Sequence, residues 1–528
     1  MLVDTVLALM SNHLSLKVVL YIGTALALFC HALTRKRVYP PGPKGFPFIG
    51  NLLQVPVGHP WLQYSSWAGT YGEIVHLKTL GDHIIILNSV KVAKELLEGR
   101  SAIYSDRPNL AMLTLAQLDR EMPMRPYGEE WRAQRKILAQ SFSHGMLPQY
   151  HHIQELEARR LVRGLLQNPD DVVSLAKTRI AAIIMHITYG WTVMGDEDEM
   201  VNTGSQGVAD FAAASEPGKW LVNLIPLLRF VPRWVPGASF RRIADGWNEF
   251  HRAMVPAPYL WCKRQTEAGS LRERCVVGSV LSQIEGELSP EDDATLRCAA
   301  NSAWGGGLDT NLSTTLTFFL AMLHNPRVQA KAQAEIDSVV GTERLPTIVD
   351  RLSLPYVRSV IAEVFRWSPA APLGLPHSLR QDDVYKDYLL PKSSIIVPNI
   401  WYMLHDPAVY PQPDAFLPER YANDDNEMRK VTDLAFGFGR RACPGFFFAE
   451  RTVFAIVATV LATCTIVPKL DENGDPIMRE IEYTSSTIVF PKDVVCDIKP
   501  RSLKAIDLLE ELLNAQSDEV GTGMTSSQ

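Results

Sequence analysis

One stretch of ten residues near the C-terminus constrains this chain most, because it surrounds a single cysteine with what a thiolate metal ligand needs. Residues 436–445 read Phe-Gly-Phe-Gly-Arg-Arg-Ala-Cys-Pro-Gly. The glycines allow a tight turn and a close approach of bare backbone to a flat group, and Arg441 supplies a fixed cation. The run 446–463 has almost no helix breaker and predicts a helix just after Cys443. Its N-terminal end should favour the ionised thiol.

Cys443 could instead be a small buried hydrophobe, as most free cysteines are. The pattern Phe-x-x-Gly-x-Arg-x-Cys-x-Gly, however, should occur by chance in a chain this long with a probability on the order of 10⁻⁴. The stretch resembles the haem-binding loop of the cytochrome P450 family, in which a cysteine thiolate holds the iron. The resemblance implies that Cys443 is the axial metal ligand of haem b, with Phe436 and Arg441 beside the cofactor.

Composition narrows the function classes. The chain has 528 residues, of which 46% are hydrophobic and 21% charged, enough for one large core or two coupled domains. Its formal net charge of -6 gives no basic excess, so we expect no nucleic-acid partner. The odd number of scattered cysteines, without any Cys-x-x-Cys pair, favours neither a disulfide framework nor a cysteine zinc site. The seven are Cys30, Cys262, Cys275, Cys298, Cys443, Cys464 and Cys496.

The first fifty residues carry the signals of a membrane anchor and a stiff connector. Residues 18–33 are apolar apart from one histidine and, with the two residues before them, approach the ~20 residues that span a bilayer. The basic cluster Arg35-Lys36-Arg37 follows, and such a cluster stays cytosolic. The sequence predicts a short lumenal N-terminus over residues 1–15, a transmembrane signal anchor over 16–34 and a basic, proline-rich hinge over 35–50. The hinge resembles that of microsomal family members.

A cleaved signal peptide is the alternative for this region. No small-x-small cleavage motif follows the apolar run, and the odd cysteine count argues against secretion. We therefore expect a single-pass protein of the endoplasmic reticulum membrane with its catalytic domain, residues 51–504, facing the cytosol. Residues 505–528 become acidic and then polar, which predicts a disordered tail.

A small sheet and a helix with two large polar side chains are predicted next. Residues 74–77 and 83–87 have the pattern of short strands, and residues 90–97 that of a helix. Trp131 and Arg135 lie four apart on a later helix and so share one face. By themselves they could be ordinary structural residues. Beside Cys443 they resemble the family's propionate-binding helix, in which an indole and a guanidinium contact the haem carboxylates. Residues 205–260, rich in tryptophan and proline, predict either a mobile cover or plain helical packing.

The longest predicted helix begins at Ser289, with a proline and acids in its first turn, and continues to Pro326. At ~1.5 Å per residue it would be about 50 Å long. The run 305–307 is Gly-Gly-Gly, which costs roughly 1 kcal/mol per glycine in a helix. Such a cost is typical of a place where a ligand lies against the helix.

An acid beside an alcohol, Asp309-Thr310, follows the glycines and forms a possible proton-delivery pair. A lone glycine run could be a kink in a core helix. With Asp309 and Thr310 it resembles the oxygen-activation segment of the same family, in which Gly306 lies at the haem. Trp304 and Asn311 depart from the small residue and the hydroxyl that are commoner there.

Glu363 and Arg366 lie three apart on one face of a helix, a pair worth only a few tenths of a kcal/mol if exposed. With Arg420, in Pro-Glu-Arg-Tyr, they resemble the family's buried structural triad. Residues 370–377 predict an extended apolar wall, with His377 near a haem carboxylate. Residues 388–390 and 394–397 predict short strands, and residues 483–490 a strand pair with a turn near the pocket.

The resemblance spans about residues 40 to 500, with five motifs in order. It implies a mainly α fold with a small β region, the cytochrome P450 fold, preceded by one N-terminal transmembrane helix. It also implies a monooxygenase that inserts one oxygen atom from O2 into a lipophilic small molecule. Asp309 and Thr310 would steer protons. The haem carboxylates would be neutralised by Arg441, Trp131, Arg135 and His377.

Electrons would come from another protein, because the chain contains no Rossmann or flavin glycine fingerprint. NADPH would therefore act only indirectly, through an NADPH-haemoprotein reductase, with cytochrome b5 as a further partner. Two other classes use a similar loop. A thiolate-haem isomerase or dehydratase needs neither O2 nor a reductase, but such enzymes usually lose the acid–alcohol pair. A non-catalytic haem sensor would leave that pair idle.

The substrate is expected to be lipophilic, because the candidate pocket segments are mostly apolar. These segments are residues 110–124, 211–214, 300–307, 370–376 and 484–489. The style of the motifs resembles fungal enzymes of secondary-metabolite biosynthesis. A terpenoid scaffold is the preferred expectation, with polyketide and indole-alkaloid scaffolds as alternatives.

Overall fold

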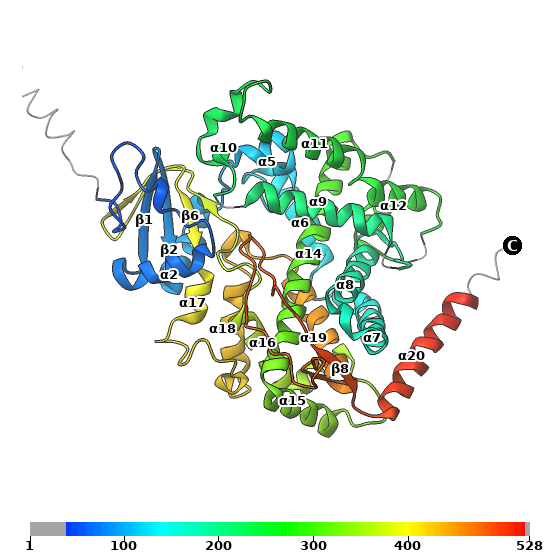
Figure 1. The fold of residues 1–528 in the computed structure, drawn as a ribbon. Coiled ribbons are helices and arrows are strands. Elements are labelled where there is room, and N and C mark those ends of the chain that lie inside the picture. Colours follow the sequence, from blue (N-terminus) through cyan, green and yellow to red (C-terminus); the bar gives the residue numbers. More distant parts are fainter. Residues whose placement is uncertain (1–37, 196, 217, 272, 285, 523–528) are drawn as a thin grey trace, which may run out of the picture.

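The computed structural model describes residues 38–195, 197–216, 218–271, 273–284 and 286–522, with side chains to residue 515. Helices build most of the molecule, and a small sheet lies at one side of it (Figure 1). The predicted mainly α fold with a small β region is therefore confirmed. The predicted lumenal segment, the transmembrane anchor and the basic cluster at residues 35–37 lie outside the described residues.

The helices follow the chain in two groups. The first group contains α2 (Pro60–Tyr71), α3 (Val90–Ala93), α4 (Ser101–Tyr104), α5 (Ala111–Ala116), α6 (Glu129–Ser141), α7 (His151–Gln167), α8 (Val172–Tyr189), α9 (Glu199–Ser215), α10 (Leu221–Leu224), α11 (Ser239–Ala253) and α12 (Ala257–Glu267). The second contains α13 (Val276–Leu281), α14 (Pro290–His324), α15 (Pro326–Val339), α16 (Pro355–Trp367), α17 (Ile400–His405), α18 (Asp425–Ala435), α19 (Phe446–Thr463) and α20 (Leu503–Thr522).

The main sheet joins both ends of the chain in the order β1-β2-β6-β3. β1 (Ile74–Thr79) and β2 (Asp82–Leu87) form an antiparallel hairpin, β6 (Ile395–Pro398) pairs parallel to β2, and β3 (His377–Ser378) pairs antiparallel to β6. Two smaller pairs are β4 (Asp383–Tyr385) with β5 (Tyr388–Leu390) and β7 (Cys464–Val467) with β8 (Asp497–Pro500). The strands predicted at residues 74–77, 83–87, 388–390 and 394–397 are confirmed.

The strand pair predicted over residues 483–490 does not form a regular ladder. One isolated bridge joins Tyr483 to Pro491, and Thr484 N donates to Phe490 O at 2.8 Å. Further backbone groups of the turn bind other elements. Val489 N donates to Ala370 O at 2.9 Å, and its carbonyl accepts from Ser313 Oγ at 2.6 Å. The segment is therefore a turn fixed between α14 and the wall at residue 370.

The described part of the hinge, residues 38–50, lies against β1. His76 N donates to Pro41 O at 2.9 Å. A Cβ added at Gly42 would overlap the carbonyl oxygen of His76, so only glycine allows this approach. The proline-rich segment therefore docks on the sheet and fixes where the chain enters the folded body.

α14 crosses the centre of the helical region and contacts α6, α8, α9, α16 and α19 (Figure 1). Its start is capped as predicted, because Ser289 Oγ accepts from Asp292 N at 3.1 Å and Pro290 occupies the first turn. It ends at His324, before Asn325 and Pro326. The helix remains α-helical through its three glycines.

Two described segments are long and apolar enough to cross a membrane by length and composition, Pro169–Tyr189 and Phe446–Thr463. The protein itself buries 67% and 72% of their hydrophobic windows. They contain α8 and α19, which pack against α14 and α7. Both segments are therefore accounted for as core helices.

The predicted disordered tail is wrong for its described part. α20 spans Leu503–Thr522, and Leu509 and Leu513 are 0% and 3% exposed. These leucines lie four residues apart on one helical face, and α20 contacts α7 and α19. The polar composition of the segment concealed a short apolar stripe, and burial of that stripe stabilises the helix.

The tryptophan- and proline-rich region forms α9 to α12 and covers α5. A second apolar core, separate from the main one, joins α5 to this region through Met112, Ala214, Val222 and Ala244. Phe211 packs against the same core and does not line the main cavity. The prediction that residues 211–214 line the pocket is therefore wrong, because these side chains hold the cover to α5.

Candidate active site

The cysteine loop is shaped by its two glycines. After α18 the chain turns at Gly437 and Gly439, whose φ angles are +83° and +57°, in the left-handed region that glycine adopts at little cost. A Cβ at Gly439 would overlap the carbonyl oxygen of Leu97. Cys443 N donates to Phe436 O at 2.8 Å and closes the loop. The loop therefore holds the cysteine between α18 and α19.

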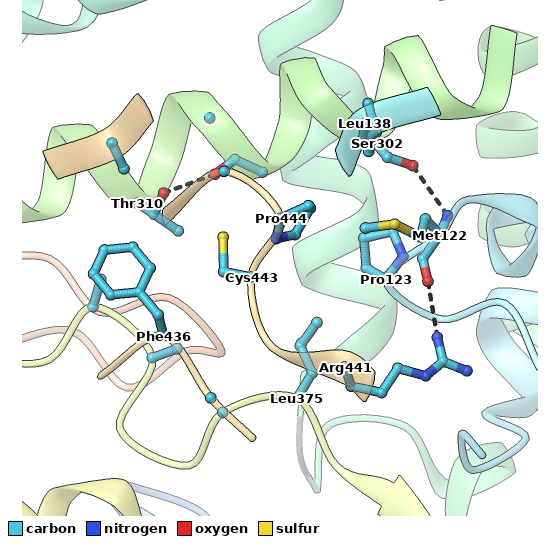
Figure 2. Close-up of a pocket in the computed structure, with 18 of the residues that line it drawn as sticks. Met122, Pro123, Leu138, Ser302, Thr310, Leu375, Phe436, Arg441, Cys443 and Pro444 are labelled. Carbon is cyan, nitrogen blue, oxygen red and sulfur yellow. Dashed lines mark hydrogen bonds between the residues drawn. The ribbon is translucent and has the colours of Figure 1, made fainter. Parts of the chain in front are cut away.

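Cys443 faces a cavity of about 280 Å³, and the glycine-bearing part of α14 lies on the opposite side (Figure 2). Most of the cavity wall is apolar. Apolar lining side chains include Leu138, Phe142, Ile184, Ile187, Phe365 and Phe448. The predicted pocket segments 110–124, 300–307, 370–376 and 484–489 all contribute at least one lining residue.

The protonation of the thiol differs from the sequence prediction. Burial raises the pKa of Cys443 above its ordinary value, although the N–H of Gly445 and the charge of Arg135 act in the opposite direction. The helix end thus does not outweigh burial of the anion in the protein alone. A bound metal cation would reverse this balance, because a coordinating thiol loses its proton.

The glycines of α14 leave room on the cavity side. A Cβ at Gly306 would meet no atom within 4 Å, whereas one at Gly307 would lie 2.8 Å from Cδ1 of Ile184. Gly306 therefore leaves a flat surface toward Cys443, and Gly307 allows α8 to pack closely. Thr310 Oγ1 donates to Gly306 O at 2.7 Å, so its lone pairs remain available to a group in the cavity (Figure 2).

Asp309 and Asn311 flank the threonine. Burial raises the pKa of Asp309 to about 6, while Lys177 acts to lower it. Asn311 lines the cavity, is 2% exposed, and donates from Nδ2 to Gly307 O at 2.6 Å. Its Oδ1 has no partner among the described residues. Asn311, noted in the sequence as a departure, therefore supplies an additional acceptor beside Thr310.

Trp304, the other departure, points away from the cavity. Its ring packs against Gly204 of α9, where an added Cβ would lie 2.6 Å from Cε2. Trp304 is 4% exposed. The glycine and the tryptophan thus form a matched contact between the cover and α14.

Three guanidiniums surround one end of the cavity without a carboxylate at ion-pair distance among the described residues. Arg441 donates to the carbonyls of Ser105, Met122 and Arg125 at 2.8, 3.1 and 2.7 Å, and burial lowers its pKa to about 10. Arg135 donates to the carbonyl of Ala442, and burial lowers its pKa. Trp131 lies beside them, 4.5 Å from the Arg441 guanidinium carbon to the ring centroid.

Arg107 is the third of these cations, and the sequence reasoning missed it. It lines the cavity, is 9% exposed, and donates to the carbonyls of Pro123, Leu375 and Pro376 at 2.6 to 2.8 Å. Burial, and then the charge of Arg441, hold its pKa well below the ordinary value. Its sequence context, Ser-Asp-Arg-Pro, gave no periodic or motif signal, because the carbonyls that hold it come from distant segments.

His377 also lines this end of the cavity. Its Nδ1 lies 2.8 Å from Tyr104 O, and a carbonyl only accepts, so Nδ1 carries the proton. Burial, and then the charge of Arg107, hold the pKa of His377 well below its ordinary value. Nε2 is therefore a lone-pair acceptor in the protein alone. Donation to a haem carboxylate would require the imidazolium, which a neighbouring carboxylate stabilises.

The structure brings together the predicted triad away from the cavity. Glu363, fully buried, accepts from Arg366 at 2.8 Å through each of its oxygens and from Arg420 Nε at 3.1 Å. Tyr421 Oη donates to Glu363 Oε2 at 2.6 Å, and the sequence reasoning missed this member. Glu363 also accepts from Leu417 N at 2.9 Å. The cluster thus ties α16 to the segment before α18.

The cavity fits an iron porphyrin by an observation of charge. Three buried guanidiniums at one end, paired only with carbonyls, would leave uncompensated positive charge. A haem supplies two carboxylates there, a flat ring beside Gly306, and a metal for the cysteine. Fold and site together define a mainly helical protein of the haem-thiolate class.

Comparison with known proteins agrees with this class. The family model described as "Cytochrome P450" matches residues 40–491, so the chain belongs to the cytochrome P450 family. Cytochrome P450 monooxygenase 105 of Postia placenta is 51% identical over 490 residues, covering 92% of this chain and 94% of the relative. Cytochrome P450 monooxygenase claR of Ampulloclitocybe clavipes is 37% identical, covering 92% and 90%. The chain is therefore a cytochrome P450 monooxygenase.

Proposed function

We propose that Cys443 is the axial thiolate ligand of haem b and that the enzyme inserts one oxygen atom from O2 into a lipophilic small molecule. The observation that carries the proposal is the position of the Cys443 sulfur, which faces the glycine-bearing part of α14 across an apolar cavity. When bound, the thiolate-ligated iron supplies the activation of O2. The chain's own residues hold the cofactor, exclude water and move protons.

Arg441, Arg107, Arg135 and Trp131 would hold the haem carboxylates. Each guanidinium is already fixed by a backbone carbonyl, so little side-chain entropy is lost when a carboxylate binds. His377 would join them in its charged form. Phe436 and Gly306 would border the ring, because both line the cavity near Cys443.

Thr310 and Asp309 would deliver protons. Thr310 Oγ1 can accept a proton-bearing group while it donates to Gly306 O. Asp309 has a pKa of about 6, so it can take up and release a proton near neutral pH. Asn311 Oδ1 offers one more acceptor on the same wall.

Electrons would come from an NADPH-haemoprotein reductase, with cytochrome b5 as a second donor. Exposed cations of α6 and the cysteine loop support a docking face there. The guanidinium carbons of Arg132 and Arg440 lie 5.7 and 5.5 Å from the ring centroid of Tyr127. A positive face of this kind suits an acidic electron donor. An N-terminal anchor in the endoplasmic reticulum membrane would keep the cytosolic domain beside this partner.

The substrate would be a lipophilic scaffold of fungal secondary metabolism, with a terpenoid preferred over polyketide and indole-alkaloid scaffolds. The apolar cavity wall supports a lipophilic compound. The fungal origin of the similar monooxygenases supports the setting. Their printed names specify no substrate.

The test uses the full-length chain in membranes with a reductase. The reduced carbon monoxide adduct should show the red-shifted absorption that a thiolate donor imposes, and Cys443→Ser should lose it. Incubation with NADPH, O2 and a panel of terpenoid, polyketide and indole scaffolds should yield products heavier by one oxygen atom. Turnover without O2 and NADPH would instead indicate an isomerase or dehydratase. A wild-type adduct without the red shift would overturn the ligand assignment.

A further inference from the structure

Three side chains of metal-ligating type meet at the surface, outside the cysteine cavity. His152 lies in the first turn of α7, His186 in the last turn of α8, and Glu273 in the loop between α12 and α13. His186 Nε2 lies 2.6 Å from Glu273 Oε2, and His152 Nε2 lies 3.3 Å from the same oxygen. The three ligand atoms all lie within 4.8 Å of one another.

We propose that His152, His186 and Glu273 form a Zn²⁺ site that ties the paired helices α7 and α8 to the loop before α13. Two imidazole nitrogens and one carboxylate oxygen are a common zinc set, with water or another ligand in the fourth position. At metal–ligand bonds of about 2.0–2.1 Å, tetrahedral ligand atoms lie roughly 3.3 Å apart. The present spacing therefore needs only small side-chain movements.

The exposure of the three residues allows those movements. The His152 side chain is 56% exposed and Glu273 49%, whereas His186 is 12% exposed. His186 is thus the fixed member, held in the α7–α8 contact, and the other two can adjust to it. Figure 1 shows α7 and α8 side by side, which agrees with their packing contact.

The protonation states also suit a cation. Hydrogen bonds from the two histidines hold the pKa of Glu273 far below its ordinary value, so the carboxylate is ionised at neutral pH. The hydrogen bond to Glu273 raises the pKa of His152, and a backbone hydrogen bond to Gln149 raises it further. With Nε2 directed at Glu273, Nδ1 is the nitrogen left for that backbone bond. Such a bond fixes the tautomer in which Nε2 can bind a metal.

The competing explanation is a metal-free surface network of His–Glu hydrogen bonds, which would contribute little to stability. The two explanations differ in one measurable property, the affinity for zinc. The site lies behind the cavity wall, because α8 also contributes Ile184 and Ile187 to that wall. Zinc binding itself does not depend on the haem assignment, so failure of one proposal leaves the other intact.

The experiment is a zinc titration of the haem-loaded full-length chain after treatment with a chelator. We expect one Zn²⁺ per chain, bound with a dissociation constant that His186→Ala and Glu273→Gln each weaken by roughly tenfold or more. His144→Ala, which changes an exposed histidine outside the cluster, should leave the affinity unchanged. Each variant is first checked for the same carbon monoxide adduct spectrum, which excludes misfolding.

A second measurement reads the staple directly. Zinc should raise the thermal midpoint of the wild-type chain and of His144→Ala, but not that of Glu273→Gln, because a ligand stabilises only the state that binds it. Equal zinc affinity in the wild-type chain and the two ligand variants would overturn the proposal, since the metal would then bind elsewhere. Absence of zinc binding to the wild-type chain would overturn it as well.

Discussion

Arg135 donates a hydrogen bond from Nη1 to the backbone carbonyl of Ala442, the residue directly before Cys443. This bond joins α6 to the cysteine loop across 307 positions of sequence. The same guanidinium lines the cavity, where it can also bind a haem carboxylate. One side chain therefore fixes the sulfur-bearing loop and holds the cofactor.

Arg135→Gln should speed haem loss. A hydrogen bond to a charged group contributes about 1.5–3 kcal/mol, which corresponds to a roughly tenfold to hundredfold faster transfer of haem to an acceptor protein. The matched control is Lys136→Gln, which removes the neighbouring exposed cation. Haem transfer is followed by absorbance. Equal transfer rates for the two variants would show that Arg135 does not hold the cofactor.

Glu363→Gln should destabilise the fold by about 3–5 kcal/mol, because Arg366 would be left as a buried charge without its ionised partner. Glu363 and Arg366 are both 0% exposed. Glu427→Gln, which breaks an exposed pair with Lys430, should change stability by less than about 1 kcal/mol. Chemical unfolding gives both values. A small effect at Glu363 would contradict the role of the triad as a structural tie.

Asp309→Asn should change the pH dependence of stability. The pKa of Asp309 is raised by burial to about 6, so the folded chain keeps this proton at pH values where the unfolded chain has lost it. This contribution favours folding at low pH and is lost as the pH rises through about 6. The neutral amide avoids burial of the charge. Asp309→Asn should therefore gain thermal midpoint relative to the wild-type chain between pH 5 and pH 7.

The comparison is made on the haem-loaded chains in buffers of equal ionic strength, with Asp119→Asn as a carboxylate control outside α14. A midpoint difference that stays constant from pH 5 to pH 7 would show that Asp309 does not titrate in this range. In the same variant, the yield of product per NADPH consumed should fall, because the proton donor is lost.

Gly204→Ala should have opposite signs in two backgrounds. In the wild-type chain the new Cβ would lie 2.6 Å from Cε2 of Trp304, so the substitution should destabilise the fold. In the Trp304→Ala background the obstruction is gone, and alanine in a helix is favoured over glycine by roughly 0.5–1 kcal/mol. The unfolding free energies of the four proteins form a double-mutant cycle. Additive effects would contradict the contact between α9 and α14.

Local sequence carried much of this site. The loop around Cys443 and the capped helix with its glycines and Asp309-Thr310 each need only neighbouring residues, because turn geometry, capping and helix propensity are local properties. The triad pair on α16 could be predicted for the same reason. Arg107, Tyr421 and the orphan oxygen of Asn311 could not, since their significance depends on which distant atoms surround them.

The chain's sequence by itself determined the class of protein, the ligand cysteine to be tested and the order of the helices that frame it. Tertiary structure alone decided which charges are buried without a carboxylate, that residues 211–214 pack on α5, that α20 is ordered, and that His152, His186 and Glu273 meet. The physical reason is that burial and electrostatics arise from contacts between distant segments, and the periodicity of a single segment does not specify its partners.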